Sequence, residues 1–410
     1  MIKKHPYIQS LKVENLGLFD NLEVNFTSGI NIIIGPNSSG KTSILRAITF
    51  CFNSQGLKKM KFSKNALFGI IINEGNEKKF MAGYQSLIKD NDTYQSNKII
   101  QGNKFPEPSF SPLSGEVPYN ILAIGAHRFF DYKEVTFLKK EEERFEAKKK
   151  YDQNNPDYID KPNLPSIKQW MVNRYFQIDK DWAHIEKKNW EVVINNLPQL
   201  APNENKFILK EIGRDLEPKF ELDGNVCYLE ELSSGFKSVL SIVFSIVQWI
   251  ELVNEGNNRL IENAEGTVLI DEIDSHLHPS WQAKIMPVLK SIFPSIQFIV
   301  TTHSPLVMST VRNDENNSIQ KIVYIKGEGY RCEKISTYGN DASSIIEGTL
   351  NTIPRDLKSN EAFSVLYDLI DKEKYEEAEE SLKMLKFAYG DLPELIKAES
   401  MLTFLMASEE

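Results

Sequence analysis

The sequence predicts an α/β fold in which a mixed sheet is flanked by helices, and three observations predict it. A glycine-rich loop, residues 35–42, lies between a buried strand pattern at 30–34 and a helical pattern at 43–48. A second buried aliphatic run, 266–270, ends in two carboxylates, and a third, 296–302, ends in a histidine. Apolar strands that end in chemically active residues are typical of a sheet with its site at the carboxyl edge.

The composition favours an ordinary globular protein. The chain has 410 residues, of which 41% are hydrophobic and 26% charged, enough for two or three structural units. It has no apolar run of 18 residues and no amino-terminal secretory signal, so we expect no membrane partner and a cytoplasmic location. Cys51, Cys227 and Cys332 are far apart and fit no metal-ligand spacing, so we expect reduced thiols.

The net charge of −9 argues against DNA binding over the whole surface. Two local basic patches remain, one at residues 58–61 with Lys64 and one at Lys139 and Lys140 with residues 148–150. Because glutamates are interspersed in the second patch, we interpret it as a solvated helix face.

The hydrophobic pattern predicts the order of elements. Strands are expected at 7–13, 22–26, 30–34, 66–73, 79–84 and 119–125, with a long polar loop at 86–118. Two or three helices at 133–200, hairpins at 207–222 and 319–335, and a helical tail are expected after them. The predicted parts are a first head lobe at 1–132, a helical insertion at 133–200, a second head lobe at 201–337 and a helical C-terminal region at 338–410.

The loop at 35–42 is a complete Walker A motif, or P-loop, at the start of a helix. Its glycines let backbone N–H groups surround a β-phosphate. Lys41 is expected to reach the β- and γ-phosphates, and the Thr42 hydroxyl to ligate Mg²⁺. The sequence therefore predicts ATP and Mg²⁺ as cofactors. The expected ATP-binding residues are Gly35, Pro36, Asn37, Ser38, Ser39, Gly40, Lys41, Thr42 and Ser43.

The other two strand ends complete the predicted site. Asp271 and Glu272 form a Walker B motif, in which Asp271 would hold Mg²⁺ through water and Glu272 would orient or deprotonate the attacking water. His303 is expected to donate to the γ-phosphate. Glu272 and His303 are therefore the expected catalytic residues. Gln85 is a candidate for a further Mg²⁺ ligand, without support from its neighbours.

Ser233, Ser234 and Gly235 begin a long apolar helix. Hydroxyl and backbone N–H donors at a helix N-terminus can bind an anion. The other interpretation is that the serines only cap the helix. The order of P-loop, serine motif, Walker B and histidine resembles the ATP-binding-cassette (ABC) type of ATPase head. In that type the signature serine contacts the γ-phosphate held by a second protomer. The resemblance implies an ATP-dependent dimer, or higher oligomer, with composite sites.

Residues 271–279 resemble the Asp-Glu…Leu-His-Pro motif of the overcoming-lysogenization-defect and RecF-like ATPases, and residues 301–305 resemble their switch segment. The D-loop residues are Ser275, His276 and His278. Transporter ATPases carry an aspartate where His278 stands, which disfavours a transport function.

Three further stretches, 124–133, 170–190 and the tail after Tyr338, resemble the PtuA-like ATPase subunit of Septu-type anti-phage systems, including those attached to retrons. The resemblance implies a separate PtuB-like HNH nuclease as partner. We expect the insertion or the tail to dock the nuclease, with Trp182 and Trp190 as candidate exposed anchors, although core packing is the commoner role of any single such residue.

No nuclease domain is evident in the chain itself. The pair Glu347-Gly348 could open a Toprim domain, but no Asp-x-Asp motif follows it. The alternative function is a RecF-like repair clamp that binds DNA directly. A structural cohesion protein of the SMC class would need long coiled-coil arms, and the sequence has no sustained heptads.

Overall fold

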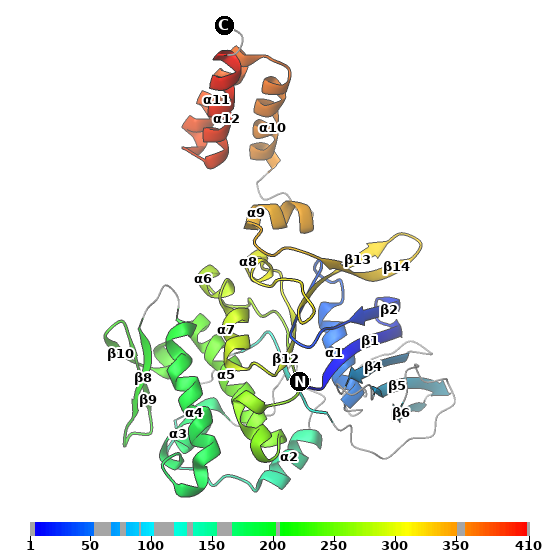
Figure 1. The fold of residues 1–410 in the computed structure, drawn as a ribbon, viewed down its shortest axis with the longest axis vertical. Coiled ribbons are helices and arrows are strands. Elements are labelled where there is room, and N and C mark those ends of the chain that lie inside the picture. The colour runs from blue at the N-terminus through cyan, green and yellow to red at the C-terminus, as the bar shows by residue number, and fades with distance from the viewer. Residues whose placement is uncertain are drawn as a thin grey trace. The chain divides into compact units, whose positions relative to one another are not determined.

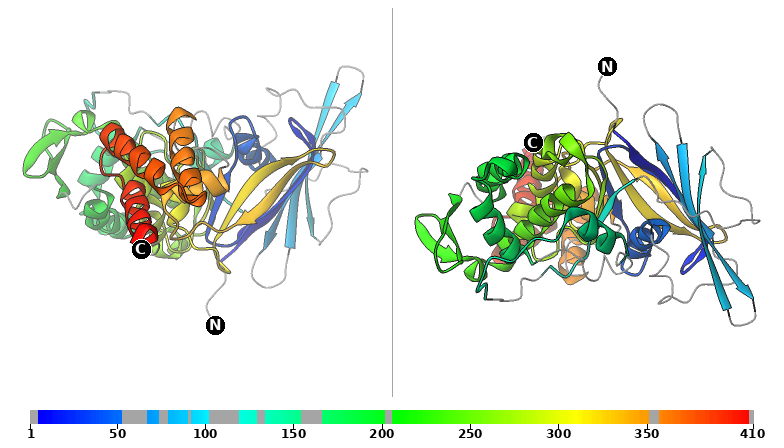
Figure 2. Two further views of the ribbon diagram at one scale, coloured as in Figure 1. Left: turned by 90° about the horizontal axis from the view of Figure 1, so that it is seen from above. Right: turned by 90° about the horizontal axis from the view of Figure 1, so that it is seen from below.

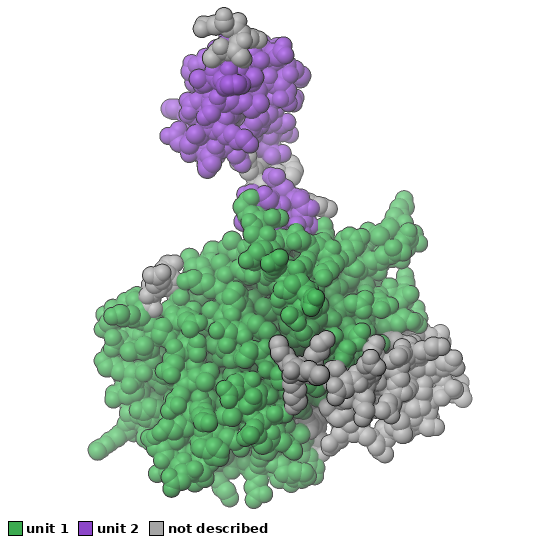
Figure 3. All heavy atoms as spheres, viewed as in Figure 1, with its two compact units in different colours: residues 1–341 green, residues 342–410 purple. Residues whose placement is uncertain are grey.

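The computed structural model contains two compact units, residues 1–341 and 342–410 (Figure 3). The described residues are 5–52, 67–73, 79–89, 92–101, 119–128, 134–153, 166–201, 206–350 and 357–407. Only the backbone is described for residues 67, 79–89, 92–101, 152–153, 357–358 and 407. The predicted basic patch at 58–64 therefore lies outside the described residues.

A six-stranded sheet forms the centre of the first unit (Figure 1). Its order is β14 (Gly329–Ile335), β13 (Ser318–Ile325), β3 (Ile30–Ile34), β12 (Gln297–Thr301), β11 (Thr267–Ile270) and β7 (Ile121–Ile124). All neighbours are parallel except the β13–β14 hairpin at the edge. Every residue of β3, β7, β11 and β12 is buried, because other elements cover both faces of a mainly parallel sheet. The carboxyl ends of the parallel strands meet at one edge.

A five-stranded antiparallel sheet forms a second layer of this unit. Its order is β2 (Phe19–Asn25), β1 (Tyr7–Leu16), β4 (Leu67–Asn73), β5 (Lys79–Lys89) and β6 (Asp92–Gln101). Helix α1 (Lys41–Phe52) packs between the two sheets and contacts β4 and β5 of one and β7 and β12 of the other (Figure 2).

The expected polar loop at 86–118 is wrong for residues 86–89, which form the end of β5, and for residues 92–101, which form β6. The β5–β6 hairpin is held by backbone pairing from Phe80 to Lys89, and that pairing does not depend on apolar side chains. A polar strand at the edge of an antiparallel sheet carries little hydrophobic signal in the sequence. Residues 102–118 lie outside the described residues.

Helices cover the other face of the central sheet. The long helix α5 (Ser234–Val253) is surrounded by α2 (Arg144–Gln153), α3 (Ile167–Gln177), α4 (His184–Asn196) and β7, and α7 (Ile285–Ile292) packs on α4. Among the described residues, α5 is the one helix long and apolar enough to cross a membrane, and 83% of its most apolar stretch is buried inside the protein. This burial identifies α5 as the core helix of the unit.

Trp170, Trp190 and Phe244 form an aromatic cluster that joins α3 and α4 to α5, with ring centroids 5.6–6.4 Å apart. Of the two interpretations of Trp190, the exposed anchor is wrong and core packing holds, because its side chain is 6% exposed in this cluster. Trp182 is 65% exposed and remains available as an anchor.

A small third sheet and several short helices complete the first unit. The sheet pairs β8 (Phe207–Ile212) with β9 (Pro218–Leu222) and β9 with β10 (Asn225–Tyr228), so the predicted hairpin has a third strand. The short helices are η3 (Asp181–Ala183), η4 (Leu197–Leu200), η6 (Leu229–Glu231), η7 (Gly256–Arg259), η8 (Ile261–Asn263), α6 (Pro279–Gln282) and α8 (Pro305–Ser309).

The second unit is helical. It contains α9 (Ala342–Ser344), the π-helical η9 (Ile345–Thr349), α10 (Leu357–Asp371), α11 (Tyr375–Tyr389) and α12 (Pro393–Ala407). Leu366, Leu382, Leu395 and Leu402 belong to a buried core that the last three helices share. The predicted fold class, a mixed sheet with flanking helices and a helical C-terminal region, is confirmed. The exact predicted boundaries at 133, 201 and 338 stay predictions.

Candidate functional site

The Walker A loop connects β3 to α1 at the carboxyl edge of the central sheet. Its glycines are required for steric reasons, because a Cβ on Gly40 would lie 2.4 Å from the Phe19 ring and one on Gly35 would lie 2.6 Å from Ser39 Oγ. Ser38 and Gly40 have positive φ angles of 61° and 90°, which curl the loop. The buried Ser39 hydroxyl has no hydrogen-bond partner among the described residues, as expected of a loop built to receive phosphate oxygens.

Lys41 lies inside the curl of the loop. Its ammonium group donates to the backbone carbonyls of Gly35 and Pro36, both at 3.0 Å. Burial lowers its pKa from the ordinary value, while the nearby carboxylates, Asp271 foremost, oppose the shift. A desolvated ammonium group held only by neutral carbonyls is well suited to bind phosphate.

Two threonine hydroxyls fix the Asp271 carboxylate. Thr42 Oγ1 donates to Asp271 Oδ2 at 2.8 Å, and Thr301 Oγ1 donates to Asp271 Oδ1 at 2.6 Å. One hydroxyl and one carboxylate are hard oxygen ligands of the kind that Mg²⁺ takes together with water and substrate phosphates. Among the described residues, no group of three or more His, Cys, Asp or Glu side chains could hold a metal ion.

Glu272 occupies an unusual backbone conformation. Its φ is +47°, in the left-handed region, which residues with a Cβ atom rarely adopt. Its N–H donates to Thr301 Oγ1 at 2.8 Å, and its carbonyl accepts from Arg128 at 2.5 Å. The backbone is thus held in place by two partners while the carboxylate stays exposed and faces the P-loop cavity.

Arg128 is a site residue to which sequence analysis gave no role. Its guanidinium is buried and donates to the carbonyls of Asp271 at 2.7 Å and Gly125 at 2.8 Å, and to Ser238 Oγ at 3.1 Å. Burial lowers its pKa to about 10, so it is charged at neutral pH. Arg128 therefore ties the end of β7, the Walker B turn and α5 together. Its position four residues beyond the end of β7 was the available signal.

His303 lies just beyond the carboxyl end of β12, the strand between β3 and β11 in the central sheet. Its backbone N–H donates to Asp274 Oδ1 at 3.4 Å, and the Thr302 hydroxyl donates a hydrogen bond to the same carboxylate. Burial and the positive charge of Lys41 lower the pKa of the imidazole below its ordinary value. At neutral pH the ring is therefore mostly neutral, with one nitrogen that can donate.

These residues surround one cavity of about 240 Å³. Its lining brings together most of the predicted site, namely Asn37, Ser38, Gly40, Lys41, Thr42, Ser43, Asp271, Glu272 and His303. Leu18, an exposed residue in the β1–β2 turn, also lines the cavity and was not predicted. The side chain of Gln85, on β5, is not among the described side chains.

The signature residues do not join this cavity. Ser233 is the N-cap of α5, where its Oγ accepts from the N–H of Phe236 at 3.5 Å, and both Ser233 and Ser234 are exposed. Gly235 is buried against Trp281 of α6, and a Cβ at Gly235 would lie 2.3 Å from the indole ring. The serine motif is thus an N-cap in this chain, with its hydroxyls at the surface.

The D-loop lies between the Walker B turn and α6. The Ser275 N–H donates to the Glu272 carbonyl at 2.8 Å, which closes a tight turn directly after the acidic pair. His276 is exposed with a φ of +65°. His278 caps α6, since its Nδ1 accepts from the N–H of Ser280.

Comparison with known proteins identifies the family. A family model described as "AAA domain, putative AbiEii toxin, Type IV TA system" matches residues 30–309. The chain belongs to this AAA-domain family. The match runs from the start of β3 to the end of α8, so it includes the P-loop, the signature, the Walker B turn and His303.

Similar proteins narrow the relationship within the AAA-domain family. The chain is 29% identical to Septu protein PtuA of Bacillus thuringiensis over 316 residues, covering 75% of this chain and 74% of that protein. It is 24% identical to the retron Vc95 probable ATPase of Vibrio cholerae serotype O1 biovar El Tor over 390 residues, which covers 77% of this chain and 74% of that protein. The suspected relationship to PtuA-type ATPases is therefore confirmed.

A solved SMC head bound to the C-winged helix domain of ScpA matches the fold with a TM-score of 0.50. The sequence identity is 17%, and the match covers 80% of this chain and 98% of that one. The likeness shows that this AAA-domain chain has an ABC-type head fold.

Proposed function

We propose that this chain is a Mg²⁺-dependent ATPase whose ATP-bound dimer regulates a partner HNH nuclease in anti-phage defence. One observation carries the proposal. Lys41, Thr42, Asp271, Glu272 and His303 converge from three neighbouring strand ends on a single cavity. That set supplies phosphate-binding, metal-binding and water-orienting groups for phosphoryl transfer to water.

Each side chain has a distinct role in the proposed hydrolysis. Lys41 binds and orients the phosphates, and the neutral imidazole of His303 donates a hydrogen bond to the γ-phosphate. The Glu272 carboxylate orients the attacking water and accepts its proton. Thr42 and Asp271 would hold Mg²⁺, which when bound neutralises charge on the β- and γ-phosphates.

The position of the signature supports dimerisation. Ser233 and Ser234 are exposed, and neither lines the cavity of their own protomer. If their hydroxyls contact a γ-phosphate, that phosphate belongs to a second copy of the chain. ATP would then act as part of the interface, and hydrolysis would release the two copies.

Two substitutions test the ATPase. Lys41→Ala removes the phosphate-binding ammonium group and is expected to abolish nucleotide binding in equilibrium titrations. Glu272→Gln keeps the binding site and is expected to bind ATP, lower kcat by at least about 100-fold and accumulate as a dimer in light scattering. Glu211→Gln, on the small third sheet, is the matched control and should behave like the unmodified chain.

Hydrolysis at the unmodified rate by Glu272→Gln would refute the assigned catalytic residue. A monomeric Glu272→Gln chain in saturating ATP would refute the dimer while leaving the ATP site intact.

The relatives and the surface of the second unit support the nuclease partner. The Septu and retron names of the relatives belong to those proteins, and we transfer their kind of system to this chain as part of the proposal. Met384, Phe387 and Phe404 of α11 and α12 are 69%, 95% and 75% exposed. Large apolar side chains at such exposure are typical of a protein interface, and we propose that this unit docks the nuclease.

Capture from the native host tests the partner. Tagged Glu272→Gln, purified with ATP and Mg²⁺, is expected to retain a small HNH protein in equal amount. Phe387→Ser with Phe404→Ser should lose that protein and keep ATP hydrolysis. Recovery of DNA and repair proteins without a nuclease, together with salt-sensitive DNA binding by the purified chain, would instead favour the RecF-like clamp.

A further inference from the structure

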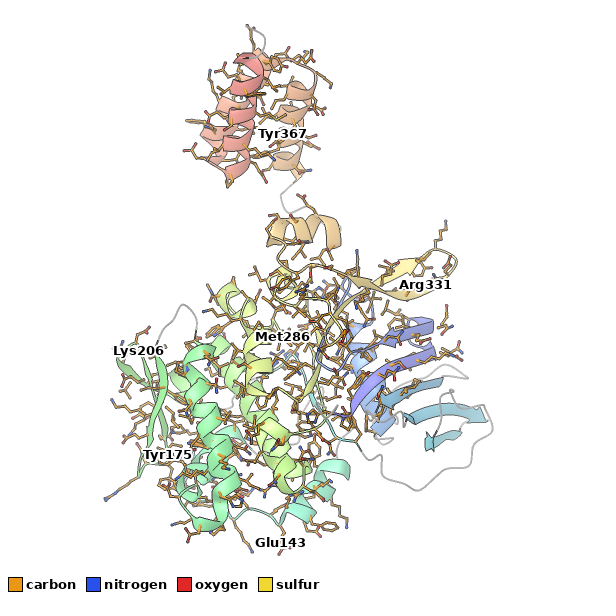
Figure 4. All side chains as sticks on the ribbon, viewed as in Figure 1. Glu143, Tyr175, Lys206, Met286, Arg331 and Tyr367 are labelled. Carbon is orange, nitrogen blue, oxygen red and sulfur yellow. The ribbon has the colours of Figure 1, made fainter. Side chains whose placement is uncertain are left out.

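A second cavity, of about 460 Å³, opens among the helices of the first unit, away from the P-loop. It is lined by the segment before α2 and by α2, α3, α4, α5 and η7. Figure 4 labels Glu143, directly before α2, and Tyr175, on α3, which mark two of these elements. Its volume lies within the range of small-molecule sites, and none of the P-loop, Walker B or His303 residues lines it.

Gln248 of α5 is the unusual feature of this cavity. Its side chain is 4% exposed and lines the cavity, yet neither Oε1 nor Nε2 has a hydrogen-bond partner among the described residues. A buried amide without partners is costly, and most native proteins satisfy both atoms. The amide presents one acceptor and one donor side by side, which matches the edge of a nucleobase.

Arg174 contributes a further polar atom to the same cavity that has no hydrogen-bond partner among the described residues. One nitrogen of its guanidinium bonds Glu251 Oε2 at 2.6 Å, but Arg174 Nε has no partner among the described residues. The guanidinium stands over the Trp170 ring, 5.4 Å from its centroid. Gln248, Arg174 and Trp170 together give the cavity a floor that is aromatic and able to form further hydrogen bonds.

The rim of the cavity favours an anion. Six basic and four acidic side chains line it, although the whole chain carries a net charge of −9. Most of these charges are paired, as in Lys150 with Glu142 and Arg259 with Glu186. The ammonium groups of Lys139 and Lys140 have no ion pair among the described residues and are exposed. They are free to bind a phosphate at the mouth.

From this arrangement we infer that the cavity is a second nucleotide site, which takes a nucleoside monophosphate with its base edge on Gln248 and its phosphate at Lys139 and Lys140. The site is separate from the proposed ATPase site. It would allow a nucleotide other than the hydrolysed ATP to bind against α5, whose first residues carry the signature.

The test uses the full chain with Lys41→Ala, which silences the P-loop, and measures binding of AMP, GMP, CMP and UMP by titration calorimetry. At least one monophosphate is expected to bind with a Kd below 1 mM, on the order of the weakest specific ligands. Adding Gln248→Met should weaken that binding by about tenfold or more, the effect of losing one good bidentate base contact. Lys139→Gln with Lys140→Gln should weaken it and reduce the advantage of the monophosphate over its nucleoside.

Gln177→Met is the matched control, since Gln177 on α3 also has a buried, unpartnered amide oxygen but does not line the cavity. It should bind nucleotide like the Lys41→Ala parent. Circular dichroism and thermal unfolding establish that each variant is folded. No binding of any monophosphate at 5 mM, or equal binding by the Gln248→Met and Gln177→Met chains, would overturn the inference. Both outcomes are independent of whether the P-loop hydrolyses ATP.

Discussion

At the scale of single residues, Thr301 holds both acidic residues of the Walker B turn. Its one hydroxyl donates to the Asp271 carboxylate and accepts from the Glu272 N–H, at 2.6 and 2.8 Å. It is completely buried at the end of β12. A residue on one strand thereby sets the positions of the proposed metal ligand and the proposed catalytic carboxylate on the next.

Thr301→Val keeps the shape of the side chain and removes that hydroxyl. Asp271 and the Glu272 N–H each lose a partner, so we expect the free energy of unfolding to fall by about 1–3 kcal/mol. Because the Glu272 carboxylate is no longer fixed, kcat for ATP hydrolysis should fall by about 10-fold or more, with a smaller change in nucleotide affinity. Steady-state kinetics and titration separate the two effects.

Thr310→Val is the control for this prediction, because Thr310 Oγ1 bonds only the backbone carbonyl of Val307 in α8. An unchanged kcat in Thr301→Val would show that Thr301 has no part in positioning Glu272.

Glu251 is a buried carboxyl with a pH-dependent contribution to stability. Burial raises its pKa from 4.5 to about 7, although Arg174 and Asn189 oppose the shift. Between pH 4.5 and 7 the unfolded chain releases this proton while the folded chain keeps it. The free energy of unfolding therefore falls as pH rises through this window, by at most about 3 kcal/mol.

Glu251→Gln should remove that part of the pH dependence. Urea unfolding at several pH values between 5 and 8 would show a smaller decline in stability for Glu251→Gln than for the unmodified chain. Glu255→Gln, whose side chain is 81% exposed, should leave the decline as it is. Parallel pH profiles for all three chains would contradict the assignment.

At the scale of elements, α6 connects the D-loop to the signature. Trp281 of α6 packs edge-on against Phe236, with ring centroids 4.7 Å apart, and lies against the Cα of Gly235. Any shift of the D-loop after hydrolysis would therefore reach the N-terminus of α5 through one indole ring.

Gly235→Ala places a methyl group 2.3 Å from the Trp281 ring and must displace it. We expect nucleotide binding to survive and the ATP-dependent dimer to weaken by about tenfold or more, since overpacking shifts the signature serines. Sedimentation with ATP in a Glu272→Gln background measures the dimer.

Gly348→Ala is the control, because a Cβ there meets nothing within 4 Å. The double variant Gly235→Ala with Trp281→Leu should recover part of the dimerisation. If Gly235→Ala dimerises like its parent, the contact between α6 and α5 has no role in assembly.

The sequence predicted those elements whose residues carry a strong local pattern. β3, β11 and β12 are buried on both faces, so their continuous apolar runs ended at the chemically active residues as expected. β6 was missed because its side chains are mostly polar, and β10 because it has four residues; both strands are stabilised by backbone pairing with a neighbour. Arg128 and Leu18 were missed because their roles depend on which distant segments fold beside them.

At the scale of the whole molecule, the two compact units separate the proposed catalysis from the proposed docking. All residues of the ATP cavity lie in residues 1–341, and α10, α11 and α12 have a buried core of their own. A unit with its own hydrophobic core can in principle fold independently of the rest of the chain.

A chain ending at Asp341 should therefore fold and hydrolyse ATP at a rate within about twofold of the full chain, since the cavity is unaltered. It should not retain the nuclease in pull-down experiments. Loss of ATP hydrolysis with retention of secondary structure would show that the second unit contributes to catalysis.

The left-handed backbone at Glu272 implies a conflict between thermal stability and the proposed ATPase activity. Glycine or asparagine adopts that conformation at lower cost than glutamate, so replacing Glu272 with either should raise the melting temperature of an enzyme that no longer turns over. Selection for thermal stability alone would therefore favour a residue at this position that cannot support ATP hydrolysis.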